Sequence, residues 1–333
     1  MNETYHPLTS LNGHLIPRIG LGCMGMSEFY GQSDRTQNLA VLNRAVELGY
    51  RHFDTADMYG MGENENLLGE FLQTQPREQL FIATKFGIKR NRSGTLKRTI
   101  DGSRDYIRRS LHDSLKRLKL DYIDLYYIHR RDSTTPIEET IDTLAKLKQD
   151  GLIRGIGLCE VSLKTYLKAH RVHPITAIQS EYSLLSREPE QGILPACQEH
   201  GTTFVAYSPM SRGLLTAKIT ASRLHQTGDN RTHLPRFNHE NLEHNLSLVE
   251  MLNVLAKQKH CTTAQVALAW VLHQSSHIHI IPGTRQEKYL IDNWQSQNIH
   301  LTDEELRALQ QHFTPEKVHG ARYPQAAMSG INE

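Results

Sequence analysis

Short apolar segments alternate with amphipathic ones along nearly the whole chain, and this alternation restricts the fold more than any other feature. Eight of the apolar segments look like strands, and segments with helical periodicity lie between them. The expected strands are residues 19–22, 51–56, 80–86, 122–129, 153–159, 177–181, 203–208 and 278–281. The expected helices are residues 39–48, 66–72, 104–120, 137–147, 163–169, 193–200, 246–257 and 289–294. Eight strands, each followed by a helix, predict a closed (β/α)8 TIM barrel in a single domain, residues 1–333.

Four segments lie outside this alternation. Residues 5–24 predict an N-terminal hairpin that turns at Asn12-Gly13, a strong two-residue turn signal. Residues 262–273 are apolar on nearly all sides and predict a buried helix. Residues 301–306 have the N-cap and the acidic first turn of an extra C-terminal helix. Residues 210–241 are polar and without a firm pattern, as long functional or mobile loops are.

The charge balance argues against nucleic acid or a membrane as a partner. The formal net charge is +2, and basic and acidic residues are matched along most of the chain. There is no run of about 18 apolar residues and no secretory signal, so we expect a cytoplasmic protein. Residues 85–109 are rich in Lys and Arg, which predicts either a solvated basic loop before a helix or an electropositive rim near an anionic ligand.

No metal site is expected. The four cysteines, Cys23, Cys159, Cys197 and Cys261, are far apart and lack zinc-site spacing, so free thiols are expected. His277 and His279 resemble an HxH metal pair, but no further ligand is identifiable.

Polar, titratable side chains stand at the ends of three successive expected strands. Asp54 ends the second strand and Tyr59 follows it, Lys85 ends the third, and His129 ends the fourth. The carboxyl ends of barrel strands meet at one rim, where active sites lie. A lysine lowers the pKa of a nearby tyrosine and a carboxylate keeps the lysine charged, so the phenol becomes able to transfer a proton. A neutral histidine is suited to orient a carbonyl group.

Each of these residues also has a purely structural interpretation. Acids at strand ends often cap helices or make turns. Lys85 and Asp54 are explained equally by a structural ion pair, and His129 and Tyr207 by a place in the core. Several independent coincidences would be needed for all of these interpretations to hold together.

The motifs FDTADMYG, IATKFG, DLYYIH, AYSPMSRGLL and IIPGTR, in this order, resemble the aldo-keto reductase superfamily. GLGCMG near the start is similar to its bacterial and plant branches, and the resemblance covers nearly the whole chain. It implies a catalytic tetrad of Asp54, Tyr59, Lys85 and His129. The implied reaction is the reversible reduction of an aldehyde or ketone by NADPH, with Tyr59 as proton donor.

The same resemblance implies the cofactor contacts. Gln179 and Cys159 would bind the nicotinamide carboxamide, and Tyr207 would stack on the ring. The other implied contacts are Gly22, Met24, Ser208, Pro209, Met210, Arg212, Gly213, Leu215, Gly283, Thr284, Arg285, Asp292 and Asn293. Arg285 would bind the 2′-phosphate, and its structural alternative is an exposed pair with Glu287 or Asp292.

The chain departs from the family pattern at two positions. Cys159 stands where the family usually has serine, and a thiol is a weaker hydrogen-bonding group. Some branches place an arginine at the position of Tyr289, which leaves the 2′-phosphate mainly to Arg285. No GxGxxG motif follows a strand, so Rossmann-type binding is not indicated.

Two other functions are compatible with a barrel. One is a slow, nicotinamide-binding regulatory or scaffold subunit. The other is a metal-dependent hydrolase. Such an enzyme would need an HxH metal-binding motif at the end of the first strand, where this chain has Gly22-Cys23-Met24. If the chain is a reductase, we expect loops to set the substrate: residues 24–33, 86–103, 130–135 and the tail from Thr314, where Tyr323 and Met328 would line the pocket.

Overall fold

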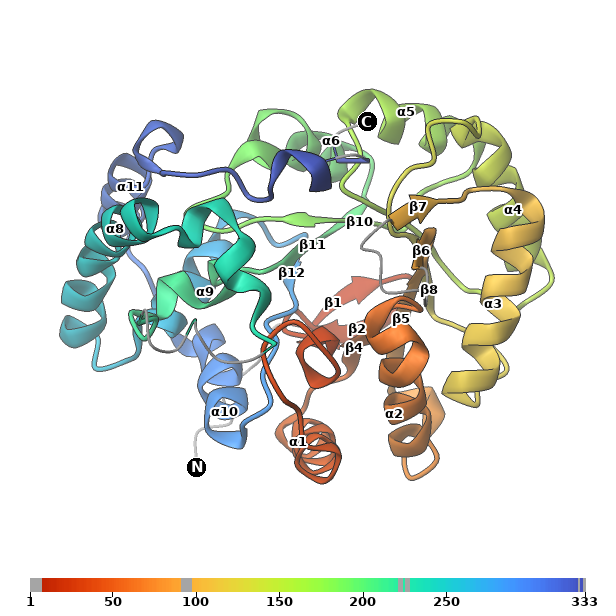
Figure 1. Ribbon diagram of the computed structural model, residues 1–333, viewed down its shortest axis with the longest axis horizontal. Helices are drawn as coiled ribbons and strands as arrows, with labels where there is room; N and C mark the ends of the chain where they lie inside the picture. Colours follow the sequence, from red (N-terminus) through yellow and green to blue (C-terminus); the bar gives the residue numbers. More distant parts are fainter. Residues whose placement is uncertain (1–7, 91–97, 221–223, 225–227, 329, 332–333) are drawn as a thin grey trace.

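Eight parallel strands form one sheet that closes on itself. The computed structural model describes residues 8–90, 98–220, 224, 228–328 and 330–331. The strands are β3 (Leu21–Gly22), β4 (His52–Asp54), β5 (Phe81–Phe86), β8 (Leu125–Ile128), β9 (Ile156–Cys159), β10 (Ala177–Glu181), β11 (Thr203–Tyr207) and β12 (Ile278–Ile280). They are ordered β12-β11-β10-β9-β8-β5-β4-β3, and a parallel bridge between Ile19 and Ile280 joins the two ends. The predicted (β/α)8 barrel is therefore confirmed (Figure 1).

The seam between β3 and β12 is held by short backbone contacts. The Gly20 N–H donates to the Ile280 carbonyl at 2.8 Å. A Cβ atom on Gly22 would lie 2.7 Å from the Ile281 carbonyl oxygen, and one on Gly283 would lie 2.8 Å from the carbonyl oxygen of Gly22. Both positions therefore require glycine if the barrel is to close.

Helices surround the strands (Figure 1). They are α1 (Arg35–Leu48), α2 (Glu63–Leu72), α3 (Arg104–Leu118), α4 (Ile137–Gln149), α5 (Leu163–Val172), α6 (Ile193–Glu199), α8 (His239–Gln258), α9 (Thr263–Gln274), α10 (Glu287–Gln295) and α11 (Asp303–His312). In α3 the buried face is formed by Ile107, Leu111 and Leu118, as the spacing predicts. All eight helices expected between strands are present. Helices α1, α2 and α8 begin earlier than predicted, because their first turns are largely polar and lack an apolar stripe.

The N-terminal hairpin covers the interior of the barrel from below. Strands β1 (Leu8–Leu11) and β2 (His14–Pro17) pair antiparallel and turn at Asn12 and Gly13, both with positive φ, as predicted. Leu11 and Ile16 are buried in the same apolar cluster as Phe81, Leu125 and Tyr127. This end of the barrel is therefore packed, and the opposite rim is left for a site.

The two remaining predicted helices are also confirmed. In α9, residues from Val266 to Val271 are buried on every side. Its N-cap Thr262 forms a capping box with Gln265. Helix α11 begins with a capping box between Thr302 and Glu305. The short 3-10 helices are η1 (Met24–Met26), η2 (Tyr59–Gly62), η3 (Arg77–Gln79), η4 (Glu188–Gln191), η5 (Ser211–Thr216), η6 (Asn230–His233), η7 (Pro235–Phe237), η8 (Ser296–Asn298), η9 (Pro315–Lys317) and η10 (Gln325–Ala327).

Two segments differ from the sequence-based expectation. The basic segment 85–109, expected either as a solvated loop before a helix or as an electropositive rim, contains an antiparallel hairpin of β6 (Ile88–Arg90) and β7 (Arg98–Ile100). Segment 210–241, expected to lack a pattern, contains η5, η6, η7 and the start of α8, and its residues 221–223 and 225–227 lie outside the described ranges. Among the residues that are described, no helix combines the length and apolar character needed to cross a bilayer.

Candidate active site

Three strands deliver polar side chains to the same end of the barrel. Asp54 ends β4, Lys85 lies near the end of β5, and His129 directly follows β8. Because β5 pairs in parallel with both β4 and β8, these side chains occupy neighbouring positions on one rim. Tyr59 reaches the same rim from η2, the short turn after β4. The structure therefore brings the four residues of the expected tetrad together.

A buried ion pair forms the floor of this site. Lys85 Nζ donates to Asp54 Oδ1 and to the carbonyl oxygen of Thr55, the second at 2.7 Å. Gln179 Nε2 donates to the other carboxylate oxygen of Asp54 at 2.8 Å. Lys85 is 1% exposed and Asp54 is 3% exposed, so each charge depends on the other for its stability.

Tyr59 lies over this ion pair. Lys85 Nζ is 5.1 Å from the centroid of the Tyr59 ring, and the His129 ring meets that ring edge-on with centroids 5.7 Å apart. Burial raises the pKa of Tyr59 above its ordinary value, and the charge of Lys85 opposes the rise. Burial also lowers the pKa of Lys85, but Asp54 and Tyr59 outweigh it, and the pKa of Lys85 is raised overall. Lys85 is thus a stable cation beside a neutral phenol.

Apolar side chains line one side of Tyr59. Met24 and Phe29, from the segment after β3, pack against a buried cluster that contains Tyr59, Met58 and Ile88. Met24 is one of the expected cofactor contacts, and the structure places it beside the expected proton donor.

The residues expected to hold the nicotinamide lie on the next strands. Gln179 on β10 is paired in register with Cys159, which ends β9. Burial raises the pKa of the Cys159 thiol to about 12, so it stays neutral. Tyr207 ends β11 with a partly exposed ring, and its hydroxyl is 3.0 Å from the hydroxyl of Tyr323. Gln179 and Cys159 therefore lie beside Asp54, and Tyr207 lies against the C-terminal tail.

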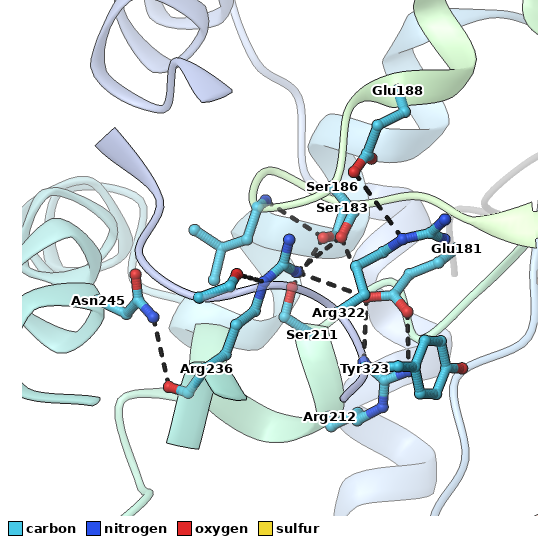
Figure 2. Close-up of polar contacts among 12 residues, drawn as sticks. Glu181, Ser183, Ser186, Glu188, Ser211, Arg212, Arg236, Asn245, Arg322 and Tyr323 are labelled. Carbon is cyan, nitrogen blue, oxygen red and sulfur yellow. Dashed lines mark hydrogen bonds and ion pairs between the residues drawn. The ribbon is translucent and has the colours of Figure 1, made fainter. Parts of the chain in front are cut away.

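The expected pyrophosphate loop follows β11. Its expected contacts are Ser208, Pro209, Met210, Arg212, Gly213 and Leu215. Ser208, Arg212 and Gly213 have φ of 48°, 55° and 97°. Left-handed non-glycine residues cost about 1–3 kcal/mol each and cluster at ligand sites. Leu215 is buried in the core, and the guanidinium of Arg212 donates to both carboxylate oxygens of Glu181, at 3.1 and 2.8 Å (Figure 2).

The residues expected at the adenosine end lie near the seam. Arg285 donates to the carbonyl oxygens of Tyr30 and Gln32, the first at 2.7 Å, so it anchors the loop after β3. Its alternative pairing with Glu287 or Asp292 is not seen, because Glu287 pairs with Arg44 at 2.9 Å. The other expected residues of this end are Gly22, Gly283, Thr284, Asp292 and Asn293. Gly22 and Gly283 are required by the close backbone contacts of the seam between β3 and β12. Asn293 is buried on α10.

No metal centre is visible in the described ranges, which hold no group of three or more His, Cys, Asp or Glu side chains suited to one. His277 is exposed and His279 is buried inside the barrel, so the HxH pair does not converge.

The family model described as the aldo/keto reductase family matches residues 18–313. The chain belongs to this family. It is 41% identical to an NADP(+)-designated aldo-keto reductase of Schizosaccharomyces pombe, over 98% of this chain and 96% of the relative. It is also 41% identical to probable aldo-keto reductase 1 of Glycine max, over 93% and 89% of the two chains. Among solved structures, the glycerol dehydrogenase of Gluconobacter oxydans superposes with a TM-score of 0.85 at 29% identity, covering 94% of this chain and 97% of the other.

This aldo/keto reductase has residues at the rim that its sequence did not single out. Arg130 follows His129 and lies close to Tyr207 and Glu160. Arg322 of the tail donates to both carboxylate oxygens of Glu160, at 3.0 and 3.1 Å. The dipeptide His129-Arg130 at a strand end was an available signal, whereas nothing in the sequence relates residue 160 to residue 322.

Proposed function

We propose that this aldo/keto reductase reduces aldehydes or ketones to alcohols with NADPH, in one domain that spans residues 1–333. The observation that carries the proposal is the meeting of Tyr59, the Lys85–Asp54 ion pair and His129 on one rim of the barrel. The Schizosaccharomyces pombe relative, an NADP(+) enzyme by name, supports the choice of cofactor.

The residues present fit a nicotinamide nucleotide. Gln179 lies beside the ion pair and would bind the carboxamide, while the partly exposed ring of Tyr207 offers a face for stacking. The left-handed residues after β11 turn the backbone of that loop sharply, as phosphate-binding segments do. When bound, the cofactor supplies the hydride that reduces the carbonyl carbon.

Tyr59 would supply the proton. Its buried phenol is neutral, so it is able to protonate the substrate oxygen as negative charge develops there. The charge of Lys85 stabilises the phenolate that remains, and Asp54 keeps Lys85 charged and in place. The His129 ring, edge-on to Tyr59, is placed to orient the carbonyl. The product is the alcohol, and Tyr59 regains its proton from solvent.

Arg285 is our candidate for the preference for NADPH over NADH. A guanidinium binds a phosphate dianion with charge-assisted hydrogen bonds. Because Arg285 also donates to the Tyr30 and Gln32 carbonyls, a phosphate bound to it would lie next to the loop after β3.

The direct test is an assay of the purified protein with NADPH or NADH and a panel of neutral aldehydes. Consumption of the reduced nicotinamide is followed by absorbance, and binding of each cofactor by fluorescence quenching. We expect turnover and a lower Kd for NADPH than for NADH. Tight NADPH binding without turnover would instead support the regulatory subunit, and equal Kd values would remove Arg285 from its role.

A further inference from the structure

Arg130 is a partly buried cation beside the expected tetrad. It directly follows His129 at the end of β8, and its aliphatic stem lies against Gly330 of the C-terminal tail. Tyr207, Tyr323 and Glu160 are close enough to interact with its charge. The side chain therefore lies at the mouth of the barrel, in the loop that begins with His129 after β8.

Arg130 forms no ion pair with any carboxylate among the described residues. Its hydrogen bond is to the carbonyl oxygen of His129, at 2.9 Å, and in the part of the chain that the structure describes no acidic side chain lies within ion-pair distance of it. A guanidinium has five N–H donors, and most of those of Arg130 have no partner among the described residues.

The nearby carboxylates are already engaged by other arginines. Glu160 is held by Arg322 at 3.0 Å. Figure 2 shows Arg212 and Arg236 both reaching Glu181, at 2.8 and 3.5 Å. Among the described residues here, the guanidinium groups of Arg130, Arg212, Arg236 and Arg322 outnumber the carboxylates of Glu160, Glu181 and Glu188. The region therefore favours an anion that the described part of the chain does not provide.

The phosphates of a nicotinamide nucleotide do not meet this need. In the proposed function they lie along the loop after β11 and the segment after β12, whereas Arg130 follows β8. Strands β8 and β11 are separated in the sheet by β9 and β10. The anion that approaches Arg130 would therefore arrive with the substrate.

We propose that Arg130 binds a carboxylate group of the carbonyl substrate, so that the protein prefers aldehydes and ketones that also carry a carboxylate. This inference rests on the proposed reductase function and names its substrate class. A carboxylate matches the planar fork of a single guanidinium. A phosphate dianion fits less well, because the carboxylate of Glu160 is near.

The first test compares two substrates of similar size, 4-formylbenzoate and its methyl ester. A charge-assisted hydrogen bond predicts that the wild type has a kcat/KM about ten- to a hundredfold higher for the acid. Arg130→Gln and Arg130→Met should bring the ratio of the two values close to one. Taking the ratio cancels any general loss of activity in a variant.

Arg131→Gln is the matched control. Arg131 is also a partly buried arginine of this loop, but it lines a separate groove of about 280 Å³ beside Pro136 and Ser162. Its loss should leave the ratio as in the wild type. A wild-type ratio near one, a ratio that survives both Arg130 substitutions, or one lost equally in Arg131→Gln would overturn the proposal.

A second measurement does not depend on turnover. Benzoate and benzamide are titrated into the protein with NADP+ bound, and the heat of binding is recorded. Benzoate should bind at least tenfold more tightly than benzamide in the wild type, and equally in Arg130→Gln. If no aldehyde is reduced, the proposed function fails while this titration still decides the role of Arg130. If Arg130→Gln weakens NADP+ itself as much as benzoate, Arg130 belongs to the cofactor site and the proposal is wrong.

Discussion

At the scale of single residues, burial and charge act on Tyr59 in opposite directions. Burial raises the pKa of the phenol, and Lys85 lowers it from a distance of 5.1 Å between Nζ and the ring centroid. The sequence allowed only the second effect to be foreseen, because burial depends on the apolar residues around Tyr59. In the structure the pKa of Tyr59 is consequently higher than the neighbouring lysine alone would suggest.

Replacing Tyr59 by phenylalanine tests the proton donor. Tyr59→Phe removes the transferable proton and keeps the ring that packs against Met24 and Ile88. We expect kcat for aldehyde reduction to fall by about 10²- to 10⁴-fold, with nearly unchanged affinity for NADPH. Steady-state kinetics and a cofactor titration measure the two effects. Activity within a few-fold of the wild type would assign the proton to another group.

Lys85→Met tests whether Lys85 lowers the pKa of Tyr59. Without the ammonium the pKa of Tyr59 should rise further, so alcohol oxidation, which needs the phenolate, should require a higher pH. The rate of oxidation is measured as a function of pH. Because Lys85→Met leaves Asp54 buried without its cation, the double variant Asp54→Asn/Lys85→Met serves as the control for folding. A folded variant with an unchanged pH profile would show that Lys85 has a structural role only.

At the scale of elements, the C-terminal tail is fastened to the rim. Arg322 pairs with Glu160, which has φ of 54° directly after β9, and Tyr323 meets Tyr207 at the end of β11. Figure 1 shows the tail, in dark blue, crossing from α11 toward α5 and α6. The expectation that Tyr323 lines the pocket agrees with this position, but no pattern in the sequence indicates the ion pair that holds the tail.

Breaking this ion pair should loosen the tail. Glu160 is 1% exposed and Arg322 is 6% exposed, so Arg322→Met leaves a buried carboxylate without its cation. We expect the free energy of unfolding to fall by about 3–5 kcal/mol, as for other buried pairs that lose one member. The double variant Glu160→Gln/Arg322→Met should recover most of the loss. Urea unfolding of the wild type, of Arg322→Met, of Glu160→Gln and of the double variant completes the cycle. A loss below about 1 kcal/mol in Arg322→Met would show that the ion pair does not hold the tail tightly.

Strands and helices could be predicted from the sequence where apolar residues recur at a regular spacing. The eight barrel strands, the hairpin at Asn12-Gly13 and the buried helix α9 all have such a pattern. The hairpin β6–β7 was missed because its strands are only three residues long and contain Lys and Arg. The start of α8 was missed for a related reason, since the buried residues of its first turns include the polar Asn245. Prediction from apolar periodicity therefore fails where an element buries polar side chains that are hydrogen-bonded to particular partners.

At the scale of the whole molecule, the barrel encloses two histidines. His52 begins β4 and His279 lies on β12, both inside the barrel and near one another. The His52 ring packs edge-on against Phe81, and neither ring nitrogen has a hydrogen-bond partner among the described residues. Burial lowers the pKa of His52 to about 4 and lowers that of His279 as well. Closing the barrel thus holds both rings in their neutral form.

This arrangement links the stability of the barrel to pH. The unfolded chain takes up a proton at His52 near pH 6.5, whereas the folded chain does so only near pH 4. The stabilising effect of a neutral His52 is therefore complete above pH 6.5 and is lost as pH falls from 6.5 to 4. The loss is about 3 kcal/mol for this one residue.

His52→Leu should reduce this acid sensitivity. The substitution keeps an apolar group of similar size against Phe81 and removes no hydrogen bond. We expect the free energy of unfolding to fall less between pH 7 and pH 4 than in the wild type, by about 3 kcal/mol, with the fall due to His279 still present. Urea unfolding at a series of pH values gives both curves, and His112→Gln on the exposed face of α3 is the control. Parallel curves for the wild type and His52→Leu would mean that His52 already carries its proton in the folded barrel, in spite of its burial.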